Sequence, residues 1–234
     1  KFFMFSFHLN HTKSTCLSEL GSSGGFRETA QAFGVSKAWC FVSVNASVRV
    51  LCEMRSTPIK LPRNKKNGAR SSLALAKIVA SFCCGAIDGS SIAINRPRDF
   101  EGWYNRNGCT FDSFSALLLS ICDHQKRFIS FDNRPGSWSD AKIFQLSCFG
   151  RNIEKILPRG HHILADSGYG VASSVMTPFN FKLSSTRMAI EGALGLLKER
   201  FRLFKKPREE RTPAASIHII VACLVLHYIF SRLP

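Results

Sequence analysis

The sequence changes from helical to strand-like patterning at the stretch Cys84-Gly85-Ala86-Ile87-Asp88-Gly89-Ser90-Ser91-Ile92-Ala93-Ile94. These residues are mostly apolar or small, and they predict a largely buried β-strand that carries one aspartate. A continuous apolar run over residues 114–122 predicts a second strand, and the β-prone residues 127–131 predict a third. Because turn-forming residues separate the second and third runs, the three strands are expected to form an antiparallel meander.

Four further elements complete the pattern: a helix, a strand and two more helices, over residues 139–148, 161–165, 185–204 and 214–230. Ser137 or Ser139 is the expected N-cap of the first of these helices. The order β-β-β-α-β-α-α predicts an α/β fold in which helices pack on a sheet.

The N-terminal part carries weaker signals. Residues 1–26 predict a poorly specified tail, residues 27–54 a helix-turn-helix-like segment, and residues 55–81 a basic linker with a short helical pattern near its end. In the helix-turn-helix pattern, Ser36 would cap the second helix and Lys37 would face DNA. A helical hairpin without DNA contact explains the same pattern.

The charge is strongly positive, with 32 Lys and Arg against 16 Asp and Glu, formally +16. Such a field attracts polyanions, nucleic acid first and an anionic membrane surface second. The longest apolar run, residues 217–230, is shorter than the roughly 18 residues that suggest a membrane span, so it predicts a core helix and no membrane partner. Nine cysteines without a CxxC pair predict reduced thiols in a cytosolic or nuclear protein.

Three carboxylates are the candidate catalytic and metal-binding residues. Asp88 interrupts the first apolar strand, where a buried carboxylate needs a cation or a metal. Asp166 directly follows the fourth strand, where ligands gather in open sheets, although a plain turn aspartate would look the same. Glu191 borders the apolar stripe of its helix, and an exposed Glu191–Arg187 pair is the simpler explanation for it alone.

Together the three acids are more informative than each alone. Two Mg²⁺ or Mn²⁺ ions need several hard oxygen ligands, and such a pair activates a water or a 3′-hydroxyl and stabilises a leaving oxygen. The sequence contains no GxSxG, P-loop or GxGxxG motif that would indicate another chemistry. The combination predicts a divalent-metal site for cutting or joining DNA.

Six ordered blocks resemble the Harbinger-type (PIF/Harbinger) transposases and their host-derived nucleases. They cover roughly residues 82–230 and are Gly85-Ala86-Ile87-Asp88-Gly89-Ser90-Ser91-Ile92, Tyr104-Asn105-Arg106-Asn107-Gly108, Pro135-Gly136-Ser137-Trp138-Ser139-Asp140, Leu164-Ala165-Asp166-Ser167-Gly168-Tyr169 with Thr177-Pro178-Phe179, Glu191 to Phe201, and Ala222 to His227. The resemblance implies an RNase H-like mixed sheet flanked by helices over residues 82–234, with Asp88, Asp166 and Glu191 as the DDE triad. Asp140 is expected to play a supporting role, as a cap or by positioning a basic neighbour.

The chain departs from this family at a few positions. Ser91 replaces a histidine, Tyr228 replaces an asparagine, and about ten residues are missing before Glu191. A shorter link would pull Glu191 out of register. Alongside a metal-dependent DNA nuclease or transposase, two alternatives therefore stay open: a catalytically decayed or domesticated DNA-binding protein, and an RNA-directed nuclease.

The expected partner is DNA, in the nucleus or in both nucleus and cytoplasm. Four basic residues are the expected DNA contacts: Lys37, Arg106, Lys198 and Arg202. The family resemblance also implies a separate Myb-like DNA-binding partner, and an oligomer is compatible with the sequence. His161 and His162 are expected to point to opposite faces of their strand, which argues against joint metal ligation. His227 is expected to be a core histidine.

Overall fold

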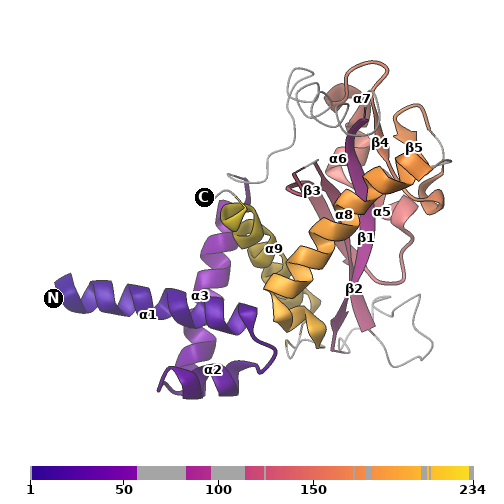
Figure 1. Ribbon diagram of the computed structural model, residues 1–234. Helices are drawn as coiled ribbons and strands as arrows, with labels where there is room; N and C mark the ends of the chain where they lie inside the picture. Colours follow the sequence, from indigo (N-terminus) through magenta and orange to yellow (C-terminus); the bar gives the residue numbers. More distant parts are fainter. Residues whose placement is uncertain are drawn as a thin grey trace.

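A computed structural model describes residues 2–56, 83–95, 114–123, 125–170, 172–177, 181–206, 210 and 212–231. Three N-terminal helices form one group, and a five-stranded sheet with its helices forms the other (Figure 1). Helix α9 lies between the two groups, because it packs against both α3 and α8. The sheet and the helix that crosses it position the candidate site.

The sheet has the strand order β3-β2-β1-β4-β5. Its strands are β1 (Cys83–Ile94), β2 (Phe114–Cys122), β3 (Phe128–Pro135), β4 (His162–Leu164) and β5 (Val175–Met176). The first three strands pair antiparallel, which confirms the predicted meander, whereas β4 pairs parallel with β1, and β5 parallel with β4. The predicted mixed α/β class is confirmed.

Eight α-helices of the described residues surround this sheet or form the N-terminal group: α1 (Phe2–Gly21), α2 (Phe26–Ala32), α3 (Lys37–Glu53), α5 (Asp140–Leu146), α6 (Cys148–Arg151), α7 (Ile153–Ile156), α8 (Phe181–Arg200) and α9 (Pro213–Phe230). Short 3₁₀ turns follow α3, β4 and α8, at Met54–Ser56, Ser167–Tyr169 and Arg202–Lys205. Side-chain caps begin four of the helices: Ser36, Ser139, Ser147 and Thr212 each accept a backbone hydrogen bond.

The two faces of the sheet bury separate core clusters. On one face, Ala86 and Ile92 of β1 pack with the apolar stripe of α8 and with α9. On the other face, Ile87 packs with α5 and α6. The alternation of β1 side chains between these clusters follows from the two-residue period of a strand. From Ala86 to Ile94 it assigns each β1 side chain to one face, Asp88 included, whereas Cys83 and Cys84 lie at a register shift before this alternation begins.

Helix α9 is the core helix that its apolar run predicts. Its buried residues run from Ser216 to His227. Among the described residues it is the one helix long and apolar enough to span a membrane, and 56% of that span is buried inside the protein.

The N-terminal tail expected at residues 1–26 is mostly helix instead. Cys16 and Leu20 are one turn apart on α1 and both are buried, at 3% and 0% exposure. These two residues give α1 an apolar contact with α3. The irregular composition of residues 1–26 does not predict this contact. Thr29 of α2 also donates a 2.7 Å hydrogen bond to the buried Glu19 of α1.

Helices α2 and α3 are joined by a short turn in which Gly34 has a left-handed φ of 63°. Ala30 is buried beside this turn, and Ser36 Oγ accepts a 3.1 Å hydrogen bond from Trp39 N. Gly34 and Ser36 thus occupy the turn and the cap that the pattern predicts; that the pair is a helix-turn-helix, and that it contacts DNA, stay predictions.

Other elements differ from expectation in their bounds. The helix predicted over residues 139–148 ends at Leu146, because Ser147 starts α6 by accepting a hydrogen bond from Gly150 N. Strand β3 extends to Pro135, and the two-residue strand β5 carries no sequence signal that predicts it. Most of the basic linker, residues 57–81 with its short helix, lies outside the described residues.

Candidate functional site

Asp88 lies in the middle of β1, on the sheet face that α8 covers. Its neighbours two and four residues away, Ala86 and Ile92, belong to the core cluster on that face. The Asp88 side chain is partly buried, and its Oδ1 accepts a 2.8 Å hydrogen bond from the backbone N–H of Gly89. The strand therefore holds a carboxylate in a defined orientation beneath α8.

Asp166 lies next to Asp88 through the parallel pairing of β4 with β1. Leu164, the last residue of β4, is the register partner of Ala86, and each aspartate follows two residues later, Asp88 within β1 and Asp166 just after β4. Neighbouring strands are about 4.8 Å apart, so this register places the two aspartates side by side on the same face. Asp166 Oδ1 accepts a 2.9 Å hydrogen bond from Gly168 N, which starts the following 3₁₀ turn.

Glu191 is on α8, beside the stripe that packs on the sheet. The stripe is fully buried and consists of Ile190, Ala193, Leu194, Leu197 and Phe201. Glu191 itself is solvent-exposed at the edge of this stripe, as predicted from the helical pattern. Its side chain therefore borders the covered face of the sheet and is not part of the core.

Two contacts define how α8 runs over the sheet. Near its middle, a Cβ on Gly192 would lie 3.1 Å from the Nζ of Lys126, in the turn that follows β2. Further on, Lys198 Nζ donates a 3.3 Å hydrogen bond to the carbonyl oxygen of Ser91 in β1. Because the β2–β3 turn lies at the end of the sheet where β1 begins, α8 runs in the same general direction as β1.

Glu191 and Asp88 lie at similar backbone distances from the contact between Lys198 and Ser91. Glu191 precedes Lys198 by two helical turns, about 10.5 Å, and lies on the same side of the helix. Asp88 precedes Ser91 by three strand residues, about 10 Å. The backbone distances from this contact to the two acids are therefore similar.

The structure brings the three predicted acids together only in part. Asp88 and Asp166 are neighbours by register, and Glu191 borders the same face. Within the described parts of the chain, however, no three His, Cys, Asp or Glu side chains lie close enough to one another to hold a metal ion. The arrangement offers two adjacent carboxylates as hard oxygen ligands and a third carboxylate at the margin.

Asp140 approaches the site from the opposite face. It is the first residue of α5, and its carboxyl carbon would lie 2.9 Å from a Cβ on Gly89. Its Oδ1 is shielded from solvent. Ser139, and not Asp140, is the side chain that caps α5. The glycine after Asp88 therefore makes room for a fourth carboxylate behind the strand.

The basic residues predicted to contact DNA are in different surroundings. Lys198 is partly buried against β1, and this desolvation lowers the pKa of its amino group. Arg202 is exposed on the 3₁₀ turn after α8. Lys37 lines a cavity of about 500 Å³ with Phe26, Phe41 and Glu210, between the N-terminal helices and α9. Arg106 lies outside the described residues.

The histidines follow the sequence expectation where the structure describes them. His162 is buried, and desolvation, followed by the neighbouring His161, lowers its pKa. His227 is 3% exposed, and its ring stacks at a tilt against Phe128. Burial, followed by the nearby Arg200 guanidinium, lowers the pKa of His227 to about 4. His227 is therefore the neutral core histidine that its helix predicts.

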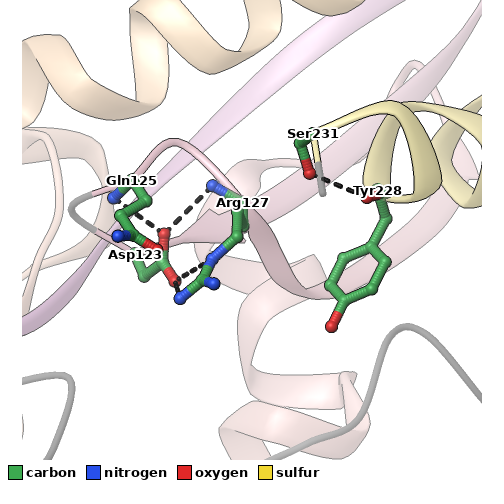
Figure 2. A network of polar contacts seen from close by, with 5 residues as sticks. All are labelled: Asp123, Gln125, Arg127, Tyr228 and Ser231. Atoms are coloured by element: carbon green, nitrogen blue, oxygen red, sulfur yellow. Dashed lines mark hydrogen bonds and ion pairs between the residues drawn. The ribbon is translucent and has the colours of Figure 1, made fainter. Parts of the chain in front are cut away.

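One polar network near the site is not predicted from the sequence. Asp123, 3% exposed, closes the β2–β3 turn by accepting hydrogen bonds from the backbone N–H groups of Gln125 and Arg127, at 2.9 and 3.0 Å (Figure 2). Its other oxygen binds the Arg127 guanidinium at 2.7 and 2.9 Å. The sequence predicts a turn here, but it does not predict that the aspartate accepts the hydrogen bonds that close the turn.

The same close-up shows the end of α9, where Ser231 Oγ donates a 2.8 Å hydrogen bond to the carbonyl oxygen of Tyr228 (Figure 2). Tyr228 stands where the family resemblance predicts asparagine, and it is partly buried. The bond satisfies a carbonyl group in the last turn of the helix, which has no partner within the helix itself.

Comparison with known proteins identifies the family of this chain. A protein family described as DDE superfamily endonuclease matches residues 87–228. The human protein named "Putative nuclease HARBI1" is 28% identical over 91% of this chain and 65% of its own length, and the Rattus norvegicus protein of that name is 29% identical with the same coverage. The Arabidopsis thaliana "Protein ALP1-like" is 27% identical over 94% of this chain and 60% of its own.

The chain thus spans about 65% of the length of these two HARBI1 proteins. No solved structure matches it significantly. The matched region starts within β1, just before Asp88, and ends in α9, so it includes all three candidate acids. The chain belongs to the DDE superfamily endonucleases, as a HARBI1-like, transposase-derived member.

Proposed function

We propose that the chain is a divalent-metal-dependent DNA endonuclease that hydrolyses phosphodiester bonds, and joins strands in a transposase-like reaction, through Asp88, Asp166 and Glu191. The observation that carries this proposal is the register of β1 and β4, in which Ala86 pairs with Leu164, because Asp88 and Asp166 each lie two residues further along the chain. The family match and the formal charge of +16 support DNA as the substrate.

The residues present fit Mg²⁺ or Mn²⁺ better than a softer metal. The candidate donors are carboxylate oxygens, which suit hard cations, whereas the cysteines nearest to Asp88 in β1 are buried thiols. Burial raises the pKa of Cys83 to about 11. A bound pair of such ions would supply Lewis-acid activation of a water or a 3′-hydroxyl and charge stabilisation at the leaving 3′ oxygen.

The protein's own residues would bind and orient the substrate. Gly89 N–H holds one oxygen of Asp88, and Gly168 N–H holds one oxygen of Asp166, so neither carboxylate needs to reorganise much on binding. Lys198 and Arg202 follow Glu191 along α8 and the next turn, where they would bind phosphates of the strand. We infer an RNase H-like fold for this domain, which the strand order supports.

The proposal is tested by incubating purified protein with duplex DNA, single-stranded DNA and RNA, each with Mg²⁺ or Mn²⁺. Metal-dependent cleavage of DNA is expected, and Asp88→Asn or Asp166→Asn should reduce it by at least about a hundredfold, as for other residues that act only in the transition state. Cleavage that survives both substitutions would remove these aspartates from the reaction. Preferential cleavage of RNA would favour the RNA-directed alternative.

A second function is supported by the exposed position of Glu191. Among the described residues the three acids do not form one compact metal cluster, and the link before α8 is short. A catalytically decayed or domesticated protein that binds DNA without cutting it would have these features. DNA binding without cleavage, unaffected by Asp88→Asn, is the result expected for that protein.

We also propose a cellular location, a further DNA contact and possible partners. The basic charge and the nuclease family favour a nuclear location, which a fluorescent fusion would report. The helix pair α2–α3, with Lys37 exposed at the start of α3, is proposed to contact DNA. A separate Myb-like partner or an oligomer would be detected by copurification and by light scattering.

A further inference from the structure

Lys126, in the turn between β2 and β3, has three features that the proposed site does not use. It is exposed, and its φ of 60° makes it the one non-glycine residue with a left-handed φ in the described part of the chain. Its amino group has no carboxylate within ion-pair distance among those residues. A lysine seldom adopts this backbone conformation, so the turn itself must impose it.

The turn imposes the conformation through hydrogen bonds around Lys126. Asp123 accepts backbone hydrogen bonds from the residues on either side of Lys126, Gln125 and Arg127. The Lys126 N–H itself donates a 3.1 Å bond to the carbonyl oxygen of Asp123. The base of this lysine is therefore fixed by the hairpin, while its charged end is free of any ion pair within the described residues.

The charged end lies against α8 at Gly192, the residue that follows Glu191. A Cβ on Gly192 would be 3.1 Å from Lys126 Nζ, and 3.2 and 3.7 Å from the two carbons before it. Adding one bond to the Gly192 Cα and one Cα–Cα step puts Nζ within about 8.5 Å of the Glu191 Cα. Gly192 has no side chain, so it leaves the space that the lysine occupies.

We infer that Lys126 is a phosphate-binding residue for the DNA strand that enters the carboxylate site. The inference rests on the proposed function, because it needs DNA to lie at Glu191. Lys198 and Arg202 follow Glu191 along the chain, whereas Lys126 reaches α8 from the sheet turn, across the helix at Gly192. Positive charge thus reaches α8 from two separate elements, at Gly192 and from Lys198 onward, where a DNA strand at Glu191 would contact both.

Binding of a fluorescent DNA duplex, measured without divalent metal over a range of KCl concentrations, tests this role apart from cleavage. Lys126→Gln removes the charge and leaves a polar side chain that is one atom shorter, and Lys126→Arg keeps the charge. Lys13→Gln, with the same charge change on the distant α1, is the matched control. The double variant Lys126→Gln/Gly192→Arg places an arginine at the α8 position that the Lys126 amino group contacts in the wild type. This arginine restores the positive charge from α8.

We expect Lys126→Gln to weaken binding several-fold and to lower the slope of log Kd against log salt by about one, the loss of one phosphate contact. Lys126→Arg, Lys13→Gln and the double variant should keep the wild-type slope. An unchanged slope in Lys126→Gln, or an equal loss in Lys13→Gln, would overturn the inference. Absence of DNA binding by the wild-type chain would overturn the proposed function and this inference with it. Equal melting temperatures establish that the variants are folded.

Discussion

Removal of the Asp123 carboxylate should destabilise the protein far more than removal of an exposed one. In Asp123→Ala, the backbone N–H groups of Gln125 and Arg127 lose their acceptor, and the guanidinium loses two contacts of 2.7 and 2.9 Å. Two backbone hydrogen bonds are worth about 2 kcal/mol together. The Arg127 side chain is 31% exposed and regains water, so the lost ion pair adds only about 1 kcal/mol. The expected decrease in the free energy of unfolding is therefore about 3 kcal/mol.

The neighbouring pair Asp132–Arg134 offers the matched control. Its side chains are 20% and 38% exposed and are joined at 3.1 Å, so Asp132→Ala should cost less than about 1 kcal/mol. Urea unfolding followed by circular dichroism measures both variants, with equal m-values required for the comparison. If Asp123→Ala loses no more stability than Asp132→Ala, the turn does not depend on the buried carboxylate and the reasoning fails.

Three further changes probe the core and the site. The pKa of His227 is about 4 in the folded protein, below its unfolded value of about 6.5, so its contribution to the free energy of unfolding is complete above pH 6.5 and decreases by at most about 3 kcal/mol as the pH falls toward 4. His227→Gln should flatten this part of the curve of stability against pH, and an unchanged curve would contradict the assigned burial. In Gly89→Ala, the new Cβ meets the Asp140 carboxylate, so we expect a loss of about 1–3 kcal/mol and weaker metal binding; wild-type behaviour in both assays would show that Asp140 moves away freely. A Cβ on Gly195 in α8 would have no neighbouring atom within 4 Å, and alanine favours a helix more than glycine does, so Gly195→Ala should stabilise the protein by about 0.5–1 kcal/mol in thermal unfolding. Destabilisation would indicate an unrecognised contact.

The elements with strong local signals were predictable from the sequence. The apolar run at residues 114–122 matches β2 because turn residues bound it on its C-terminal side. Helix α9 begins at the Thr212 cap and Pro213, a standard helix start. The positions of Asp88 in β1 and of Asp166 after β4 follow from these local patterns too. Their adjacency follows only from the β1–β4 pairing, which local patterns do not specify.

The features that sequence reasoning missed depend on contacts between distant parts of the chain. Lys126 and Gly192 are far apart in the sequence, and nothing local in either segment indicates that they meet. Helix α1 has an irregular composition, and two buried residues on one turn are enough to pack it on α3. The end of α5 depends on Ser147, whose hydroxyl competes with the backbone for hydrogen bonds.

The central claim concerns a cation held between two neighbouring strands. It is tested most directly by titrating the purified protein with Mn²⁺ and counting free Mn²⁺ by electron paramagnetic resonance. We predict saturable binding by the wild-type chain, at least about tenfold weaker in Asp88→Asn and in Asp166→Asn, with little further loss when both are changed, because the two share one ion. Wild-type affinity in both single variants, or strictly additive losses in the double variant, would contradict a shared site.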